Sequence, residues 1–252
     1  MRYSLCIGAY KERDFEYHLE KVREHGLDGL EYYKWWELDL TRVLAVQERL
    51  GVGLSAICTR FVSLVDRTMK AAYLDGLTET LEACQLLGVK SIISQTGNYI
   101  EGISRQKQLE CMISTLKEAA SLCEDKGVVL EIEPLNGLVN HKGYFLQRSD
   151  EAAVVIDEAD SDYVKLCFDI YHQQITEGNV TRNATALVDR INHYHIADNP
   201  GRNEPGTGEL NYKNILGAIA ETGFNGFVGI ECTFIEDPDI VLPRLKSEVF
   251  PQ

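Results

Sequence analysis

Short apolar segments alternate with longer amphipathic segments from one end of the chain to the other, and this alternation restricts the fold more than any other feature. The short segments have the length of buried strands, and the longer ones carry apolar residues at helical spacing. The predicted strands are 3–8, 29–33, 52–58, 90–95, 128–133, 164–169, 191–197 and 227–232. The predicted helices are 13–25, 38–50, 67–87, 103–125, 149–159, 211–222 and 237–248.

A glycine stands where several predicted helices give way to a strand, at positions 26, 51, 88, 127 and 223. Glycine adopts the left-handed conformation that ends a helix and turns the chain back. Alternating strands and helices predict parallel strands joined by right-handed crossovers, and eight such units close into a (β/α)8 or TIM barrel. A doubly wound open sheet is the alternative, but no Gly-x-Gly-x-x-Gly motif follows the first strand.

The length agrees with one barrel, because α/β barrels need roughly 250 residues for a single domain. The chain has 252 residues, and no linker or low-complexity run divides it. We therefore expect a single TIM-barrel domain over 1–252.

Charge and cysteine content restrict the setting in which the protein works. The net charge of -14 disfavours broad contact with nucleic acid or anionic lipid. The chain lacks the run of ~20 apolar residues that a membrane helix needs, and charged residues at 11–14 come too early for a signal peptide. Its seven cysteines include no Cys-x-x-Cys pair, which favours free thiols in a reducing compartment. These features predict a cytoplasmic protein without membrane or nucleic-acid partners.

Chemically capable side chains end four consecutive predicted strands, the fifth to the eighth. Such strand ends meet at the face of a barrel where active sites lie. Alone, each acid could cap the next helix, and the histidine could be a hydrogen-bonded core residue. Together, three carboxylates in one poorly hydrated cup would repel one another unless a divalent cation bound there. Three oxygens and one nitrogen favour Mg²⁺, Mn²⁺ or Co²⁺. The residues are Glu133, Asp169, His195 and Glu231.

The second half of the chain resembles the hydroxypyruvate isomerase group of the xylose-isomerase-like barrels. The motifs that carry the resemblance are Glu-Pro-Leu-Asn at 133–136, Phe-Asp-Ile-Tyr-His at 168–172, His-Ile-Ala-Asp at 195–198 and Pro-Gly-Arg-Asn-Glu-Pro-Gly-Thr-Gly-Glu-Leu-Asn-Tyr at 200–212. The resemblance is strong over roughly 128–233 and general before it. It implies one divalent ion held by Glu133, Asp169, His195 and Glu231, with both glutamates as acid/base catalysts. His195 departs from the Gln that hydroxypyruvate isomerases carry and matches the ketose 3-epimerases.

An isomerase of this kind moves a proton between neighbouring carbons of an α-hydroxy carbonyl compound. A cation stabilises the enediolate that forms, and a carboxylate removes and returns the proton. The resemblance favours hydroxypyruvate and tartronate semialdehyde, or a related oxo-acid, as substrate. An isomerase can work with one shuttling base, whereas a 3-epimerase needs bases on both faces. Because Glu133 and Glu231 supply a pair, ketose 3-epimerisation stays open as the alternative.

Two further residues are candidates for substrate binding. His172 follows Asp169 by three residues, and its imidazole could donate a hydrogen bond to a substrate oxygen or simply pack in a loop. Arg202 lies in a Gly/Pro-rich segment after the seventh strand, where it could clamp an anionic group or remain a solvated loop charge.

A second layer is predicted below the ligands, because every other residue of a strand faces the same side. Glu131 and His193 precede Glu133 and His195 by two residues. The fifth and seventh strands contribute to the same interior layers, so we expect Glu131 and His193 to touch, directly or through one water, and to support the site. A register shift, or pairing of Glu131 with Lys165, is the alternative.

Two other classes of function are weaker alternatives. Endonuclease IV-type DNA repair on the same fold needs additional histidines after the third and fourth strands and in the loop after the seventh, and none stands at 57–59, 94–96 or 198–209. A non-catalytic sugar-binding module would not need two glutamates flanking a metal. We therefore expect a small-molecule substrate, and a homo-oligomer is compatible with the sequence.

Overall fold

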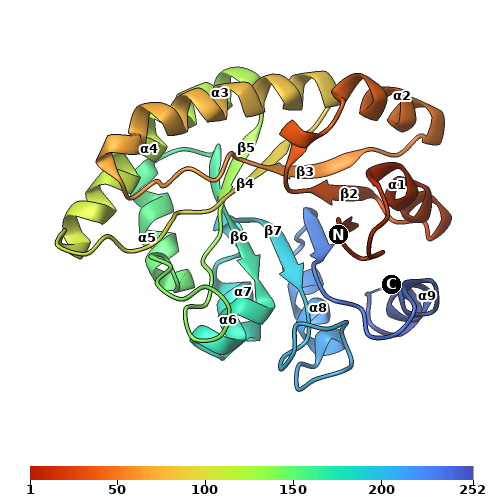
Figure 1. Ribbon diagram of the computed structural model, residues 1–252. Coiled ribbons are helices and arrows are strands. Elements are labelled where there is room, and N and C mark those ends of the chain that lie inside the picture. The colour runs from red at the N-terminus through yellow and green to blue at the C-terminus, as the bar shows by residue number, and fades with distance from the viewer. Residues whose placement is uncertain (252) are drawn as a thin grey trace.

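Eight parallel strands form a closed barrel in the computed structural model, which describes residues 1–251 (Figure 1). Each strand pairs with the next along the chain, and β8 pairs with β1 to close the ring. All eight predicted strands are confirmed. They are β1 (Arg2–Cys6), β2 (Gly29–Tyr32), β3 (Leu54–Cys58), β4 (Ser91–Ser94), β5 (Val129–Ile132), β6 (Val164–Asp169), β7 (Ile191–Ile196) and β8 (Phe227–Ile230).

Helices surround the barrel, and the seven predicted ones are confirmed. They are α1 (Phe15–Glu24), α2 (Leu40–Leu50), α3 (Lys70–Leu87), α4 (Arg105–Lys126), α5 (Ser149–Ala159), α8 (Tyr212–Glu221) and α9 (Pro238–Glu248). Two short helices between β6 and β7 were not predicted, α6 (Ile170–Thr176) and α7 (Val180–Ala186). Three 3-10 turns complete the elements, η1 (Trp35–Glu37), η2 (Arg67–Met69) and η3 (Val188–Arg190).

The predicted glycines end their helices in the left-handed conformation. Gly51, Gly88 and Gly127 have φ angles of 67°, 73° and 60° directly after α2, α3 and α4. A side chain at such an angle would clash with its own backbone, so glycine lets the chain turn back into the next strand without strain.

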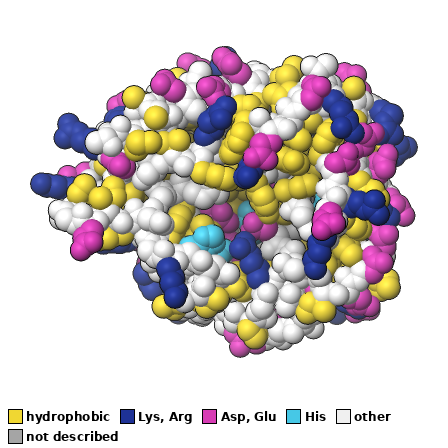
Figure 2. Space-filling model, in the orientation of Figure 1, with side chains coloured by type: hydrophobic (Ala, Val, Ile, Leu, Met, Phe, Trp, Pro, Cys, Tyr) yellow, Lys and Arg dark blue, Asp and Glu magenta, His cyan; other side chains and the backbone are white. Residues whose placement is uncertain are grey.

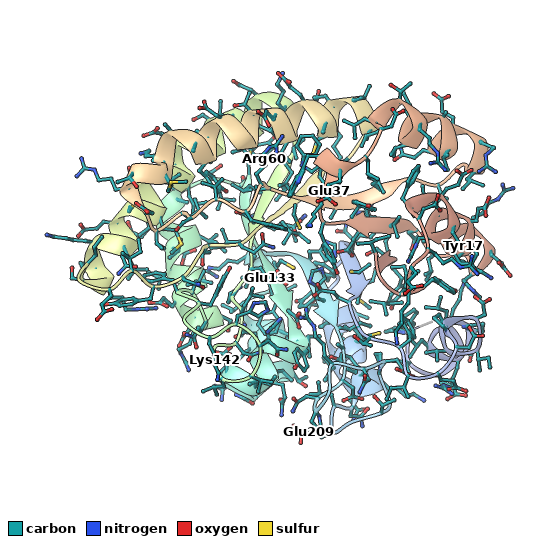
Figure 3. All side chains as sticks on the ribbon, in the orientation of Figure 1. Tyr17, Glu37, Arg60, Glu133, Lys142 and Glu209 are labelled. Carbon is teal, nitrogen blue, oxygen red and sulfur yellow. The ribbon has the colours of Figure 1, made fainter. Side chains whose placement is uncertain are left out.

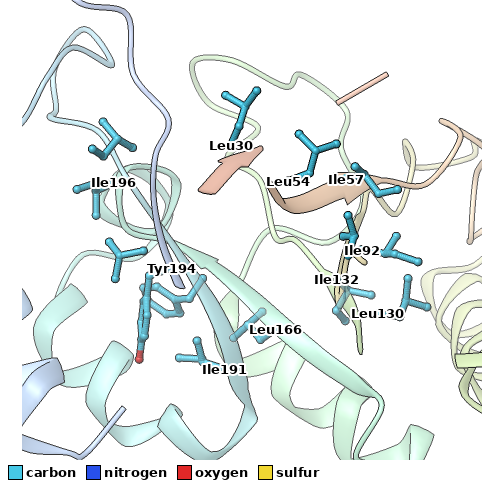
Figure 4. Packing of buried hydrophobic residues seen from close by; sticks show 14 of the residues in the cluster. Leu30, Leu54, Ile57, Ile92, Leu130, Ile132, Leu166, Ile191, Tyr194 and Ile196 are labelled. Carbon is cyan, nitrogen blue, oxygen red and sulfur yellow. The ribbon is translucent and has the colours of Figure 1, made fainter. Parts of the chain in front are cut away.

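The two faces of the strands differ in chemistry. The outer face is apolar and packs against the helices; the side chains labelled in Figure 4 include Leu30, Ile92, Leu130 and Tyr194. Burying such a side chain contributes roughly 1.5–3 kcal/mol. The interior instead holds a small apolar cluster of Ala56, Cys58, Ile93 and Cys167 beside buried glutamates and histidines. Polar chemistry is therefore concentrated inside the ring.

The first and last units of the chain are joined beside the β1–β8 pair. The rings of Tyr3 and Phe250 stack with centroids 3.7 Å apart, and Lys21 of α1 forms an ion pair with Asp239 of α9. Among residues 1–251, no helix has both the length and the apolar character needed to cross a membrane.

Candidate metal centre and active site

The four predicted ligands meet at the carboxyl ends of β5 to β8. Glu133 follows β5, Asp169 ends β6, His195 lies near the end of β7, and Glu231 follows β8. One ligand atom from each of the four lies within 4.8 Å of the others. Figure 3 places Glu133 at the centre of the ring of elements, whereas Tyr17 and Glu209 lie at its periphery. Figure 2 shows acidic and histidine side chains together in the hollowed middle of this face.

Direct contacts link the carboxylates to two nitrogen groups. His195 Nδ1 lies 3.0 Å from Glu133 Oε1 and 3.2 Å from Glu231 Oε2. Arg202 Nη2 lies 2.6 Å from Glu231 Oε2 and 3.6 Å from Asp169 Oδ2. Each of the three carboxylates therefore contacts the His195 imidazole, the Arg202 guanidinium or both.

Burial and these neighbours shift the protonation equilibria in different directions. Burial raises the pKa of Asp169, and the nearby Arg202 only partly offsets this. For Glu231, burial acts in the same direction, but Arg202 and His195 hold its pKa well below the ordinary value. Burial acts to lower the pKa of the His195 imidazole, yet Cys167, Glu231 and Glu31 raise it well above its usual range. The cluster of the four predicted ligands therefore attracts positive charge strongly.

The donor set fits a divalent cation. Three carboxylate groups and one imidazole nitrogen converge within a few ångströms. Glu133, Asp169 and His195 are buried, and Glu231 is partly exposed. Hard cations such as Mg²⁺ and Mn²⁺ prefer oxygen-rich sites of this kind. Glu133, Asp169, His195 and Glu231 could hold such an ion.

A cavity of about 330 Å³ opens beside the cluster. Tyr33 lines it and donates a hydrogen bond of 2.9 Å from its hydroxyl to Glu231 Oε1. The neighbouring Trp35 is buried and donates to the carbonyl of Cys58, so it belongs to the wall behind the cavity. The lining residues are Tyr33, Cys58, Phe61, Ile93, Gln95, Glu133, Leu135, His141, Tyr144, His195, Arg202 and Glu231.

His172 lies behind Asp169 and is completely buried. Its Nδ1 accepts a hydrogen bond of 3.2 Å from the backbone N–H of Asn136, which places the proton of the neutral ring on Nε2. Nε2 has no hydrogen-bond partner within residues 1–251 and lies 3.6 Å from Asp169 Oδ2. Burial, assisted by Arg202, lowers the pKa of His172 to about 3. The ring is therefore a neutral donor beside the ligand cluster.

The loop after β7 carries Arg202 into the cavity. Asp198 accepts hydrogen bonds from the backbone of Gly206 and Leu210, and Glu204 accepts from Ile235 and Glu236 beyond β8. These contacts fix the loop against its neighbour. Arg202 is therefore held at the site, where it faces both carboxylates and the cavity.

The layer below contains the predicted pair and one residue that the sequence reasoning missed. His193 Nδ1 lies 3.6 Å from Glu131 Oε2, and neither atom has a hydrogen-bond partner within the described chain. The other oxygen of Glu131, Oε1, accepts a hydrogen bond from the Asn192 side chain, and Lys165, the alternative partner, contacts Asp162. The missed residue is Glu31, which lies between His193 and His195. Its only sequence signal was an acid inside the apolar segment 29–33.

Comparison with known proteins agrees with this architecture. The sequence model of the xylose isomerase-like TIM barrel matches residues 19–241. Hydroxypyruvate isomerase of Escherichia coli (strain K12) is 31% identical over 237 residues, covering 90% of this chain and 90% of that enzyme.

Solved structures share the fold at lower identity. An AP endonuclease of family 2 from Brucella melitensis superposes with a TM-score of 0.92 at 22% identity, covering 98% of this chain and 99% of that one. The IolI protein with a binding zinc atom superposes with a TM-score of 0.83 at 19% identity, covering 100% of both chains. These two likenesses bear on the fold alone. From the family match and the E. coli relative, the chain belongs to the xylose isomerase-like TIM-barrel family and is an isomerase of the hydroxypyruvate isomerase-like group.

Proposed function

We propose that this isomerase is metal-dependent and moves a proton between adjacent carbons of a small α-hydroxy carbonyl compound. Its substrates are hydroxypyruvate and tartronate semialdehyde, or a related oxo-acid. The observation that carries this proposal is the placement of two glutamates, Glu133 and Glu231, at one cavity with Arg202. Similarity to the E. coli hydroxypyruvate isomerase supports the substrate class.

One divalent ion, Mn²⁺, Mg²⁺ or Co²⁺, would be held by Glu133, Asp169, His195 and Glu231. When bound, it supplies Lewis-acid stabilisation for the charge that develops on the substrate oxygens. The convergence of the four ligand atoms within 4.8 Å supports this role. The bound zinc of the structurally similar IolI protein agrees with a metal site on this fold.

The side chains around the cavity have separate roles in proton transfer and in substrate binding. One of Glu133 and Glu231 removes the C–H proton of the substrate, and a glutamate returns it to the neighbouring carbon, so that no redox partner is needed. Tyr33 and Arg202 fix the Glu231 carboxylate. His172 is fully buried and absent from the cavity lining, so its Nε2–H would act on the Asp169 carboxylate, 3.6 Å away, and not on the substrate directly. Arg202 also balances the carboxylate of an oxo-acid, since its guanidinium lines the cavity.

Ketose 3-epimerisation is the second candidate. His195 favours it, because the ketose 3-epimerases carry histidine at this ligand position. Both glutamates also line the same cavity, as an exchange between the two faces of one carbon requires.

The function is tested with protein stripped of metal by a chelator and reloaded with Mn²⁺, Mg²⁺ or Co²⁺. Turnover of hydroxypyruvate, 2-oxo-tetronate and free ketoses is followed by NMR in D₂O, where the transferred proton exchanges with deuterium. We expect reloading to restore turnover of an oxo-acid. Full activity of metal-free protein would refute the metal requirement, and turnover of ketoses alone would establish the epimerase.

The proposed setting is the cytoplasm, with a small molecule as partner and neither nucleic acid nor membrane. All seven cysteines are free, which supports a reducing compartment.

A further inference from the structure

A buried carboxylate that the proposed chemistry does not use lies inside the barrel, next to the ligand cluster. Glu31 belongs to β2 and is only 1% exposed. The Ser4 hydroxyl donates to Glu31 Oε1, and His193 Nε2 lies 3.0 Å from the same oxygen. A carboxylate at this depth is strongly destabilising unless its oxygens are bound. Its contacts therefore identify what the residue does.

The second oxygen of Glu31 contacts a proposed metal ligand. Glu31 Oε2 lies 2.9 Å from His195 Nε2. The opposite nitrogen of the ring, Nδ1, faces Glu133 Oε1 at 3.0 Å. Metal-binding histidines generally donate their other N–H to a carboxylate or carbonyl, which fixes the orientation of the ring and the nitrogen presented to the metal.

The neighbouring strand leaves room for this contact. A Cβ at Gly229 of β8 would overlap Glu31 Oε1 and lie 2.8 Å from His195 Cδ2. Only glycine therefore permits Glu31 and His195 to meet across the interior. The arrangement depends on three strands, β2, β7 and β8, in their observed register.

We infer that Glu31 is the positioning residue of the metal centre: it accepts the Nε2–H of His195 and thereby presents Nδ1 to a divalent cation. The inference rests on the proposed metal site. Glu31 acts from the side of His195 away from the cavity, since it is absent from the cavity lining while His195 is part of it. Glu31 would therefore act on the metal through His195 and not on the substrate.

The test measures Mn²⁺ affinity by titration calorimetry on the chelator-treated full chain. Glu31→Gln should weaken binding by roughly 10- to 100-fold, the usual effect of losing a partner of a metal-binding histidine. Glu177→Gln is the matched control, because Glu177 is also a buried acceptor, bonded to Ser149 and Asn183 away from the cluster. Its Kd for Mn²⁺ should equal that of the wild type. A merely structural role for Glu31 would lower the Tm and leave the Kd unchanged.

Gly229→Ala provides a second variant, since its methyl group cannot coexist with the present position of Glu31 although all four ligands remain. It should weaken Mn²⁺ binding as well. An unchanged Kd in folded Glu31→Gln, or in Gly229→Ala if Glu31→Gln does not fold, would overturn the role of Glu31. A wild-type protein that binds no Mn²⁺ would instead contradict the proposed metal site itself.

Discussion

The Tyr33 hydroxyl donates a 2.9 Å hydrogen bond to Glu231 Oε1, while Arg202 holds the other oxygen of the same carboxylate at 2.6 Å. Glu231 is thus fixed from two sides by residues of different loops. A carboxylate that must meet a C–H bond gains from such restraint, because small displacements of a catalytic group are costly.

Tyr33→Phe should lower kcat while leaving the fold intact. The change removes one hydrogen bond to a charged group, which contributes about 1.5–3 kcal/mol, or roughly one to two orders of magnitude in rate. Steady-state kinetics with the preferred substrate measure the effect. Tyr32→Phe serves as the control, since Tyr32 packs against the apolar core. Equal rates for Tyr33→Phe and wild type would show that Arg202 and His195 position Glu231 without help from Tyr33.

The fold was predictable because each repeating unit carries its own local signals. Strand, helix and terminal glycine recur along the chain, and parallel strands in that order leave few topologies. Helices α6 and α7 escaped prediction because they have only seven residues each and little room for an amphipathic pattern. Their support is tertiary: the Asp169 side chain caps α6 at the backbone N–H of His172, and α7 packs on α8.

The site was predictable only in part. The ends of parallel strands in a barrel lie on one face, so the convergence of Glu133, Asp169, His195 and Glu231 followed from their positions. Glu31 could not be found in this way, because its partner His195 lies 164 residues away and the space between them is created by Gly229. Such a contact depends on the interior packing of three strands.

Glu133→Gln and Glu231→Gln should each lower kcat by on the order of 10² or more, because each replaces a catalytic carboxylate by a neutral amide. Metal content is measured alongside by atomic emission, so that loss of a ligand is separated from loss of a base. Glu151→Gln on α5, where Glu151 pairs with Arg105, is the surface control. A variant that retains metal and near-native turnover would exclude that glutamate as an essential base.

Arg202→Ala should separate the two substrate classes. Losing a charge-assisted hydrogen bond to a substrate carboxylate costs about 1.5–3 kcal/mol, whereas a neutral ketose loses only the indirect help that Arg202 gives to Glu231. The ratio of kcat/KM for oxo-acid and ketose should therefore fall. Arg190→Ala, which removes a surface pair with Asp157, should leave this ratio unchanged. Equal losses for both classes would restrict Arg202 to holding Glu231.

The junction of the first and last helices should weaken in acid. Burial acts to raise the pKa of Asp239, but hydrogen bonds from Lys21, Tyr10 and His25 hold it well below its ordinary value. The unfolded chain therefore binds the proton more readily than the folded one. The stabilisation is complete above the unfolded pKa of about 3.9 and is lost as the pH falls through the lower folded value.

Asp239→Asn should accordingly lower the free energy of unfolding at pH 7 and have less effect with each step below pH 4. Because the Asp239 side chain is 39% exposed, solvent screening limits the loss at neutral pH to about 1 kcal/mol or less. Urea unfolding followed by circular dichroism at pH 7, 4 and 3 gives the difference at each pH. Asp162→Asn is the control, since Asp162 is 98% exposed and contacts only Lys165 at 3.4 Å among the ion pairs of the described chain. A difference between wild type and Asp239→Asn that stays constant from pH 7 to pH 3 would show that the ionisation of the Asp239 carboxylate does not contribute to stability.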